Sequence, residues 1–250
     1  EIYDSQPLML STDCELVPYA YCAGADLSYM DLSGMDLTGI DLRGANLQNS
    51  TFDYATLDGA DLRSIVAMNA TFIHTGMNDT YLQNAEFNKF SFSECGGYCG
   101  EANLTNARLG DADLTNAYLP YADLTDAYLA YADLTDANLV YADLTDASLF
   151  FADLVGTSLL GANLTDAYLR EADLIDADLR YANLTDANLV YADLTDAVLY
   201  SADLTDSDLA YADLTYANFH NAIVTNAYFG GTIWSNTIWT DGVAYNTNQA

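Results

Sequence analysis

The sequence predicts an all-β solenoid, and three observations carry this prediction. Large apolar residues recur every five positions over most of the 250 residues. A period of five matches neither the 3.6-residue period of a helix nor the two-residue period of a strand. The chain also holds 31 Asp against 6 Glu, and Asp is a poor helix former. A hydrophobic content of 51% excludes a disordered acidic tail, because such tails lack the apolar residues to bury a core.

The repeating unit is a small residue, then Asp or Asn, then Leu, then two variable positions. From Ala122 onward the chain reads ADLTDAYLAY, ADLTDANLVY and ADLTDASLFF. The small residue two before each Leu is usually Ala, because a larger one would crowd an interior that Leu already fills. A chain that turns a corner after every five residues closes a coil after about four fives. Stacked coils then pair their backbones at ~4.8 Å, as strands do.

This motif resembles the A(D/N)LXX repeat of the pentapeptide-repeat proteins, and the resemblance covers roughly residues 22 to 240. The resemblance implies a right-handed quadrilateral β-helix with four faces, whose Leu and Ala columns point inward. The 42 fives in the chain would make about ten coils, or roughly 50 Å of stack at strand spacing. Some members of this family mimic DNA and act on topoisomerases, often as dimers joined by a C-terminal helix. The last residues of this chain show no helical period.

We expect five segments: an N-terminal cap (1–21), a first repeat block (22–92), a Cys-containing interruption (93–101), a second repeat block (102–240) and a C-terminal tail (241–250). The step from Phe92 to Leu104 is 12 residues, two more than two fives. This slip predicts either a recognition loop or a slipped corner, and the short insertion favours the corner. The C-terminal stretch, with Trp234 and Trp239 at inward positions, is either a capping coil or an apolar end that docks on another molecule.

The four cysteines fall into two local pairs, Cys14 with Cys22 and Cys95 with Cys99. This grouping predicts two local disulfides, although four cysteines allow three connectivities. The alternative for Cys22 is a reduced thiol packed at an inward position. Disulfides and the missing initiator Met indicate a mature extracytoplasmic protein, that is, one secreted, at the cell surface, or in a periplasm or lumen, although a trimmed chain would explain the missing Met equally well. The two histidines, His74 and His220, fall on outward positions as surface residues.

Residues 20 apart would stack into ladders on four faces. Two opposite faces are acidic, and the two faces between them carry aromatic side chains. One acidic face stacks Asp113, Asp133, Asp153, Asp173, Asp193 and Asp213, and the other stacks Thr125, Thr145, Thr165, Thr185, Thr205 and Thr225 beside Asp126, Asp146, Asp166, Asp186 and Asp206. The aromatic columns are Tyr131, Phe151, Tyr191 and Tyr211 on one face and Tyr121, Tyr141 and Tyr181 on the other.

The two Asp positions of the repeat have different explanations. A short carboxylate one residue before Leu is placed to accept hydrogen bonds from N–H groups of the corner. The Asp two residues after Leu lacks this explanation, so the column from Asp126 to Asp206 is the candidate Ca²⁺ site, through oxygen ligands. No EF-hand loop or RTX-type glycine-rich nonapeptide supports this calcium site. No other cofactor is expected, because the chain has no P-loop or dinucleotide fingerprint.

We expect no enzyme, since the repeat singles out no Asp for acid–base work and no Ser-His-Asp arrangement occurs. The net charge of −31, with Lys89 the only lysine, excludes direct nucleic-acid binding. No apolar run reaches the ~20 residues of a membrane span. The leading hypothesis is an extracytoplasmic structural or interaction protein that binds another protein or its own copies. Such a rod would self-associate end to end into fibres through Leu8, Leu10, Trp234 and Trp239. The alternative is a DNA mimic that binds gyrase or another basic DNA-binding protein.

Overall fold

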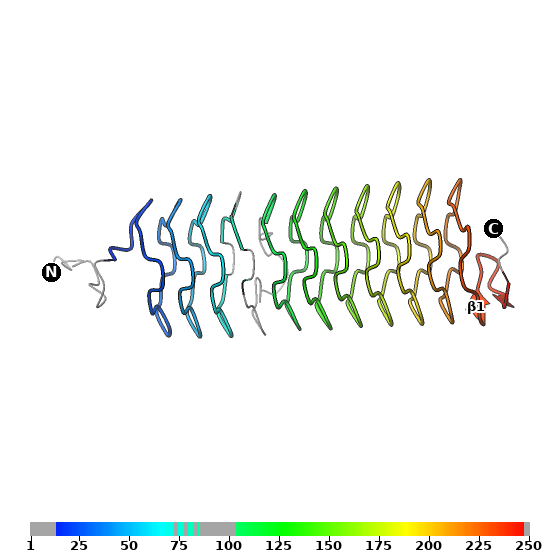
Figure 1. Ribbon diagram of the computed structural model, residues 1–250, viewed down its shortest axis with the longest axis horizontal. Coiled ribbons are helices and arrows are strands. Elements are labelled where there is room, and N and C mark those ends of the chain that lie inside the picture. Colours follow the sequence, from blue (N-terminus) through cyan, green and yellow to red (C-terminus); the bar gives the residue numbers. More distant parts are fainter. Residues whose placement is uncertain (1–13, 73–74, 78–79, 83–84, 86–103, 248–250) are drawn as a thin grey trace.

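The computed structural model describes residues 14–72, 75–77, 80–82, 85 and 104–247 as a right-handed quadrilateral β-helix. Its coils stack along the long axis, with the first and last described coils at opposite ends (Figure 1). The two regular strands of the described chain, β1 (Thr237–Ile238) and β2 (Ala244–Tyr245), form an antiparallel pair in the last coil. Among the described residues, no helix is long and apolar enough to cross a membrane.

The coil length is 20 residues, as the period of five predicts. Asp113 forms a parallel bridge with Asp133, Asp133 with Asp153, and the same step of 20 carries on to Ile233. Comparable bridges run from Tyr21 to Ile238, which corresponds to about ten coils. Each coil therefore pairs with the next as a strand pairs with its parallel neighbour, but over only one bridge residue on each side.

Hydrogen bonds between coils use three of the five N–H groups in each repeat. In one repeat, the Leu124 N–H donates to the Asp143 carbonyl at 2.7 Å and the Asp126 N–H donates to the Thr145 carbonyl at 2.9 Å. The Asp143 N–H of the next coil donates back to the Ala122 carbonyl at 2.8 Å. These bonds hold successive coils in register and leave two N–H groups per repeat to be satisfied at the corner.

The corner satisfies both remaining N–H groups locally. The Ala127 N–H donates to the Leu124 carbonyl at 3.0 Å, which closes a β-turn over four residues. The Thr125 N–H donates to the carboxylate Oδ1 of Asp123 at 3.0 Å. The prediction that Asp one before Leu accepts a corner N–H is therefore confirmed, and every backbone donor of the repeat is satisfied.

Each corner also needs a left-handed residue. From Gly24 to Asn236, every described residue two after the inward position has a φ between 54° and 75°, including Asp126 (56°), Gly156 (66°) and Tyr131 (62°). Positive φ at this one turn position is typical of a type II turn. Gly, Asn and Asp adopt this conformation readily, whereas a bulky residue such as Tyr is strained there. The Asp126 column thus has a structural explanation that the sequence pattern did not reveal.

The interior consists of the inward Leu and Ala columns, which are almost entirely buried. Phe52 and Phe72 replace Leu in two successive coils and stack face to face, with ring centroids 4.9 Å apart. Where a Thr takes the small position, its hydroxyl bonds to the backbone of the coil before it, as Thr157 does to the Leu134 carbonyl at 2.7 Å. The inward polar groups are thereby paired within the narrow interior.

The C-terminal coil is closed by its own aromatic side chains. Trp234 and Trp239 are 7% and 9% exposed, and their ring centroids lie 4.9 Å apart. Phe229 packs edge to face on Trp239 at 5.2 Å, and Phe219 lies 5.5 Å from the same ring. The structure therefore supports the capping alternative for this stretch and places both Trp rings inside the coil, where they offer little surface to a second molecule.

The register across the interruption differs from the sequence-based prediction. Tyr81 bridges Arg108, which lies 27 residues further along the chain instead of 20. The Asp113 N–H likewise donates to the Ala85 carbonyl at 3.2 Å. The chain therefore places seven extra residues between these partners, one full repeat more than the slip of two predicts. The predicted interruption itself (93–101) lies outside the described residues.

We predict that the left-handed corner discriminates sharply between substitutions at Asp126. Asp126→Val places a β-branched side chain at a φ of 56° and should lower the free energy of unfolding by about 1–2 kcal/mol. Asp126→Gly should leave it within about 0.5 kcal/mol of the wild type. Denaturant unfolding followed by circular dichroism measures both changes.

The matched control is Thr125→Val, one residue before the left-handed position, where the repeat already accepts Val140 and Val155. This variant should be near neutral. Equal destabilisation by Val at both positions would show that the conformation of residue 126 is not what the corner selects.

Candidate functional site

The four faces of the rod are defined by the repeats that stack at 20-residue intervals. We name them by one residue each: the Asp113 face, the Asp126 face, the Tyr131 face and the Tyr121 face. The bridges between Asp113, Asp133, Asp153, Asp173, Asp193 and Asp213 confirm the predicted ladder on the first face. Ring stacking between Tyr121 and Tyr141 (5.4 Å) and between Tyr131 and Phe151 (5.2 Å) confirms the aromatic columns.

The Asp113 face is an uninterrupted ladder of six half-buried carboxylates in successive coils. Each Oδ1 accepts the N–H two residues later, as Asp133 does from Thr135 at 2.9 Å and Asp173 from Ile175 at 3.1 Å. These bonds fix the direction of every carboxylate in the ladder. In the described chain this column contains no amide that would separate the charges between Asp113 and Asp213.

Partial burial raises the pKa of Asp173, and repulsion from Asp153 and Asp193 raises it further, against the lowering effect of the Ile175 N–H. A raised pKa means that the folded chain takes up a proton more readily than the unfolded chain. The stability associated with this proton is complete below the unfolded pKa of about 4 and is lost as the pH rises through the folded pKa. At neutral pH the charge on Asp173 therefore costs folding free energy.

The Asp126 face relieves its charge in a way that the Asp113 face does not. Here Asn163 follows Asp143 in the ladder one before Leu, and its Nδ2 donates to Asp143 Oδ1 at 3.1 Å and to Thr145 Oγ1 at 2.8 Å. Asn183 repeats this contact on Thr165 at 2.9 Å. Amides between carboxylates replace repulsion with hydrogen bonds.

The candidate Ca²⁺ ligands Asp126, Asp146, Asp166, Asp186 and Asp206 all lie at the left-handed corner position of this face. Within the described part of the chain, no three His, Cys, Asp or Glu side chains come together in a way that would hold a metal ion. A metal is therefore not needed to explain why Asp occurs in this column, because the backbone conformation favours it.

The Tyr131 face carries two groups of aromatic contacts. Phe150 packs edge to face on Phe151 at 4.2 Å, and it also lies 5.9 Å from Tyr131 and 5.8 Å from Tyr168. Further along, Tyr191 and Tyr211 stack at 4.9 Å. Because the stacked rings cover one another's faces, this surface presents mainly ring edges and hydroxyl groups to solvent.

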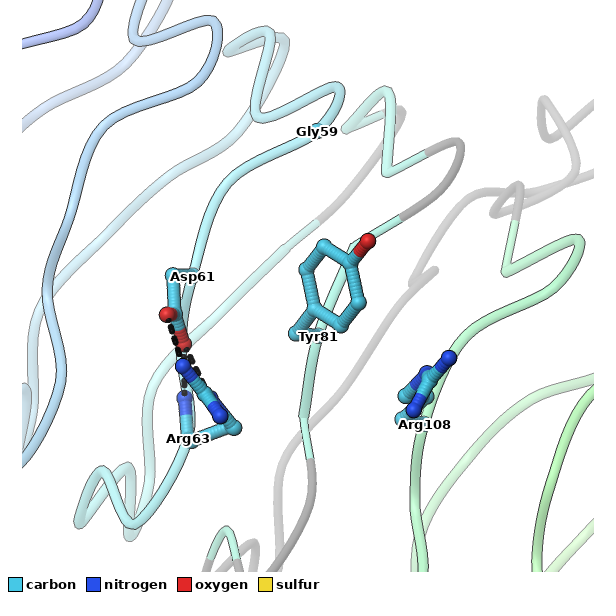
Figure 2. A pocket seen from close by; sticks show the side chains of 5 residues that line it. All are labelled: Gly59, Asp61, Arg63, Tyr81 and Arg108. Atoms are coloured by element: carbon cyan, nitrogen blue, oxygen red, sulfur yellow. Dashed lines mark hydrogen bonds and ion pairs between the residues drawn. The ribbon is translucent and has the colours of Figure 1, made fainter.

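The same face holds four of the five arginines, Arg43, Arg63, Arg108 and Arg170. The guanidinium of Arg108 lies 5.2 Å from the centre of the Tyr81 ring, and that of Arg170 lies 5.3 Å from the Tyr191 ring. Figure 2 shows Tyr81 between Arg108 and the ion pair of Arg63 with Asp61, on three successive coils. The sequence analysis did not single out these arginines, because their common face depends on the register across the interruption.

Ion pairs of the Tyr131 face use its own acids. Arg43 lies 2.6 Å from Asp41 and 3.5 Å from Asp61, and Arg63 lies 2.5 Å from Asp61. The hydrogen bond from the Arg43 side chain is the largest of the effects that lower the pKa of Asp41. Since these pairs are exposed, they add little to stability, and their main effect is to keep this face close to neutral.

The remaining predicted site residues are placed only in part. Cys14 and Cys22 form a disulfide with an S–S distance of 1.96 Å, and both are buried, so one predicted pair is confirmed. Cys95, Cys99, Leu8, Leu10 and His74 lie outside the described residues.

His220 lies at an outward position, as predicted, but it is half-buried instead of freely exposed. Its ring lies 5.6 Å from the Tyr200 ring, and its Nδ1 is buried without a hydrogen-bond partner among the described residues. Gly242 stands so close that an added Cβ would lie 2.7 Å from Nδ1. The chain that follows β1 therefore covers His220, which the period of five does not predict.

Two hollows open on the rod. One is lined by Gly59, Asp61, Arg63, Tyr81 and Arg108, and the other by Asn106, Arg108, Asp126 and Tyr128. Each hollow has one carboxylate in its lining, and neither lining contains a Ser, Cys or His. The extended faces, instead of these hollows, are the candidate functional surfaces.

We predict that Asp173→Asn stabilises the protein by roughly 0.5 kcal/mol at pH 7 and low salt, since it removes repulsion from two neighbours. Asn makes the same corner bond at Asn138, whose Oδ1 accepts the Val140 N–H at 3.1 Å, so the fold is kept. The gain should shrink towards pH 3, because Asp173, whose pKa is raised, takes up a proton as the pH falls. Thermal melts at both pH values measure it.

Asp208→Asn is the matched control, because Asp208 stacks between Asn188 and Tyr228 and makes the corner bond to Ala210 at 2.9 Å. Its stability should change little at either pH. A loss of stability in Asp173→Asn, or an equal gain in both variants, would contradict repulsion along the ladder.

Comparisons with known proteins agree with this architecture. The model of the family described as pentapeptide repeats matches eight copies, over residues 20–53, 98–130, 127–166, 162–199 and 192–231. A search of curated proteins found no match. Among solved structures, the chain is similar to QnrB1, a plasmid-mediated fluoroquinolone resistance protein, at 17% identity over 82% of this chain and 92% of that one, with a TM-score of 0.55.

It is also similar to HetL of the cyanobacterium Nostoc sp. strain PCC 7120, a protein involved in the regulation of heterocyst differentiation. This likeness has 29% identity over 90% of this chain and 91% of HetL, with a TM-score of 0.49. The repeat matches, together with the 20-residue coils and inward Leu column, settle the family. The chain is a member of the pentapeptide-repeat family.

Proposed function

We propose that this chain is a non-catalytic, rigid acidic rod that binds a basic protein through its Asp113 face. The observation that carries this proposal is a charge that the fold does not require. Asn satisfies the corner N–H as well as Asp does, as Asn188 shows with Val190 at 3.1 Å. The Asp113 face nevertheless uses Asp in six successive coils, at the cost that the raised pKa of Asp173 indicates.

The spacing of charge along the rod supports a partner that otherwise binds DNA. The net charge of −31 is spread over a stack of roughly 50 Å, or about one charge per 1.6 Å. Double-stranded DNA carries one charge per ~1.7 Å of its axis. A surface of Lys and Arg that matches DNA phosphates would therefore meet a similar charge density on this rod.

The carboxylates of the Asp113 face are also pre-organised for binding a cationic partner. The corner bonds of Asp133 and Asp173 fix their directions, while the side chains stay partly exposed. Little side-chain freedom is then lost on binding, which favours association. Lys and Arg side chains of a partner would also relieve the repulsion along the ladder.

The disulfide between Cys14 and Cys22 supports a place outside the cytoplasm, because such bonds persist in oxidising compartments. In that case the basic partner is also a protein outside the cytoplasm. If the chain is cytoplasmic instead, gyrase is the basic partner. Both alternatives use the same acidic surface and differ only in the compartment.

We predict that the rod displaces labelled duplex DNA from a basic DNA-binding protein, measured by fluorescence anisotropy at 50 mM salt. The quadruple variant Asp133→Asn, Asp153→Asn, Asp173→Asn and Asp193→Asn should compete more than about tenfold less well, because four aligned charges are lost. Raising the salt to 500 mM should abolish competition by the wild type.

The control carries four neutral substitutions at the corner of the Asp126 face: Asp126→Asn, Asp146→Asn, Asp166→Asn and Asp186→Asn. It has the same net charge, and Asn already occupies this corner at Asn106 and Asn226. It should compete far better than the first variant. Equal losses would show that only net charge matters, and an absence of competition by the wild type would remove the proposal.

A further inference from the structure

The strained corner residues are not spread evenly over the rod. At the left-handed position, the Asp126 face uses only Asp and Asn in the described second block. The Tyr131 face instead places Tyr131 (62°), Phe151 (56°), Tyr191 (63°) and Tyr211 (61°) there. A bulky residue in this conformation costs on the order of 1 kcal/mol, and such strain tends to persist where it serves a function. The aromatic side chains of this face are therefore retained at the expense of folding.

The Tyr131 face is also the place where a second acidic rod can approach. Its described repeats carry four arginines against five acids, namely Asp41, Asp61, Asp111, Glu171 and Asp208. The second-block repeats of the Asp113 face carry nine acids and no basic residue. Two copies that each carry −31 repel least when near-neutral faces meet and the acidic faces stay in solvent.

We propose that two copies of this chain pack side by side through their Tyr131 faces as an antiparallel, two-fold dimer. In this arrangement the half of one copy that carries Arg43, Arg63 and Arg108 lies over the half of the other that carries Tyr191 and Tyr211. The faces of the Tyr191 and Tyr211 rings are already covered by each other and by Arg170, so the arginines of the second copy would contact the exposed ring edges and hydroxyl groups. Tyr and Arg are also the residues that dominate binding energy in protein interfaces.

The other near-neutral surface, the Tyr121 face, provides a contrast. It carries Tyr121, Tyr141 and Tyr181 at the same left-handed corner, but it has a single described arginine. This residue, Arg180, is paired with Asp178 at 2.7 Å, just as Arg170 of the Tyr131 face is paired with Glu171 at 3.2 Å, so the two faces differ in the number of arginines and not in their pairing. Four arginines among exposed aromatic side chains distinguish the Tyr131 face, and a two-fold contact buries the same face on both copies. The proposal therefore assigns the dimer to the Tyr131 face and leaves the Tyr121 face in solvent.

The structure itself supplies substitutions that change the face without changing the fold. Asp is the native residue at the left-handed corner positions 126 and 146. The test variant therefore combines Tyr131→Asp, Tyr191→Asp and Tyr211→Asp, which keeps a residue suited to positive φ at each corner. The matched control is Tyr121→Asp, Tyr141→Asp and Tyr181→Asp, which adds the same charge at equivalent corners of the Tyr121 face. Thermal melts establish that both variants are folded.

Sedimentation velocity over ~5–500 μM, at 50 mM and 500 mM NaCl, tests the dimer. We expect the wild type to dimerise, and to do so more tightly at 500 mM, because salt screens the repulsion between the rods. The dimer dissociation constant of the Tyr131-face variant should be at least about tenfold higher than that of the wild type, and that of the control should match the wild type. A wild-type monomer under all conditions, equal losses in both variants, or loss only in the control would overturn the proposal.

Discussion

The hydrogen bond from the corner N–H to an Asp or Asn side chain is the contact on which the rest of the rod depends. Three N–H groups of each repeat pair with a neighbouring coil and a fourth closes the turn, as in the repeat around Leu124. The fifth, such as that of Thr125, has only the side chain of Asp123. At a corner of this kind, loss of the acceptor would leave a backbone donor to be satisfied by water. Other described corners, such as those with Tyr128 or Val198 before Leu, have no Asp or Asn at this position.

This constraint also separates what the fold requires from what it merely permits. The corner favours an oxygen acceptor before Leu, although Val198 also fits there, and it tolerates any residue two after Leu that accepts positive φ. Asn would supply the acceptor without charge, and Gly, Asn or Asp would adopt positive φ without strain. The Asp113 face uses Asp where an uncharged Asn would suffice, and the Tyr131 face uses aromatic residues where Gly, Asn or Asp would avoid strain. The two proposals rest on these departures. The acidic ladder and the aromatic corners thus have functional explanations that the interior Leu column does not need.

Much of the fold follows from the sequence, and the exceptions have physical reasons. Period five, the inward Leu and Ala columns and the pairing of Cys14 with Cys22 are consequences of local spacing, and the structure confirms them. The positive φ of the Asp126 column, by contrast, is a backbone property that residue type suggests only weakly. The burial of His220 depends on how the last residues fold back over the final coil, which no repeat rule describes.

The sequence by itself determined the coil: 20 residues, four faces, and the alternation of acidic and aromatic faces in the second block. These properties are local, because each repeat carries its own corner and its own inward pair. Only the tertiary structure decided how the two blocks align, since that depends on which residues bridge across the interruption. A slip of two residues would place Arg63 in line with the Asp126 face, whereas the bridge from Tyr81 to Arg108 places it on the Tyr131 face. The pairing of backbones between coils is non-local, and it brings four of the five arginines onto one face. This face is close to neutral although the chain carries a net charge of −31.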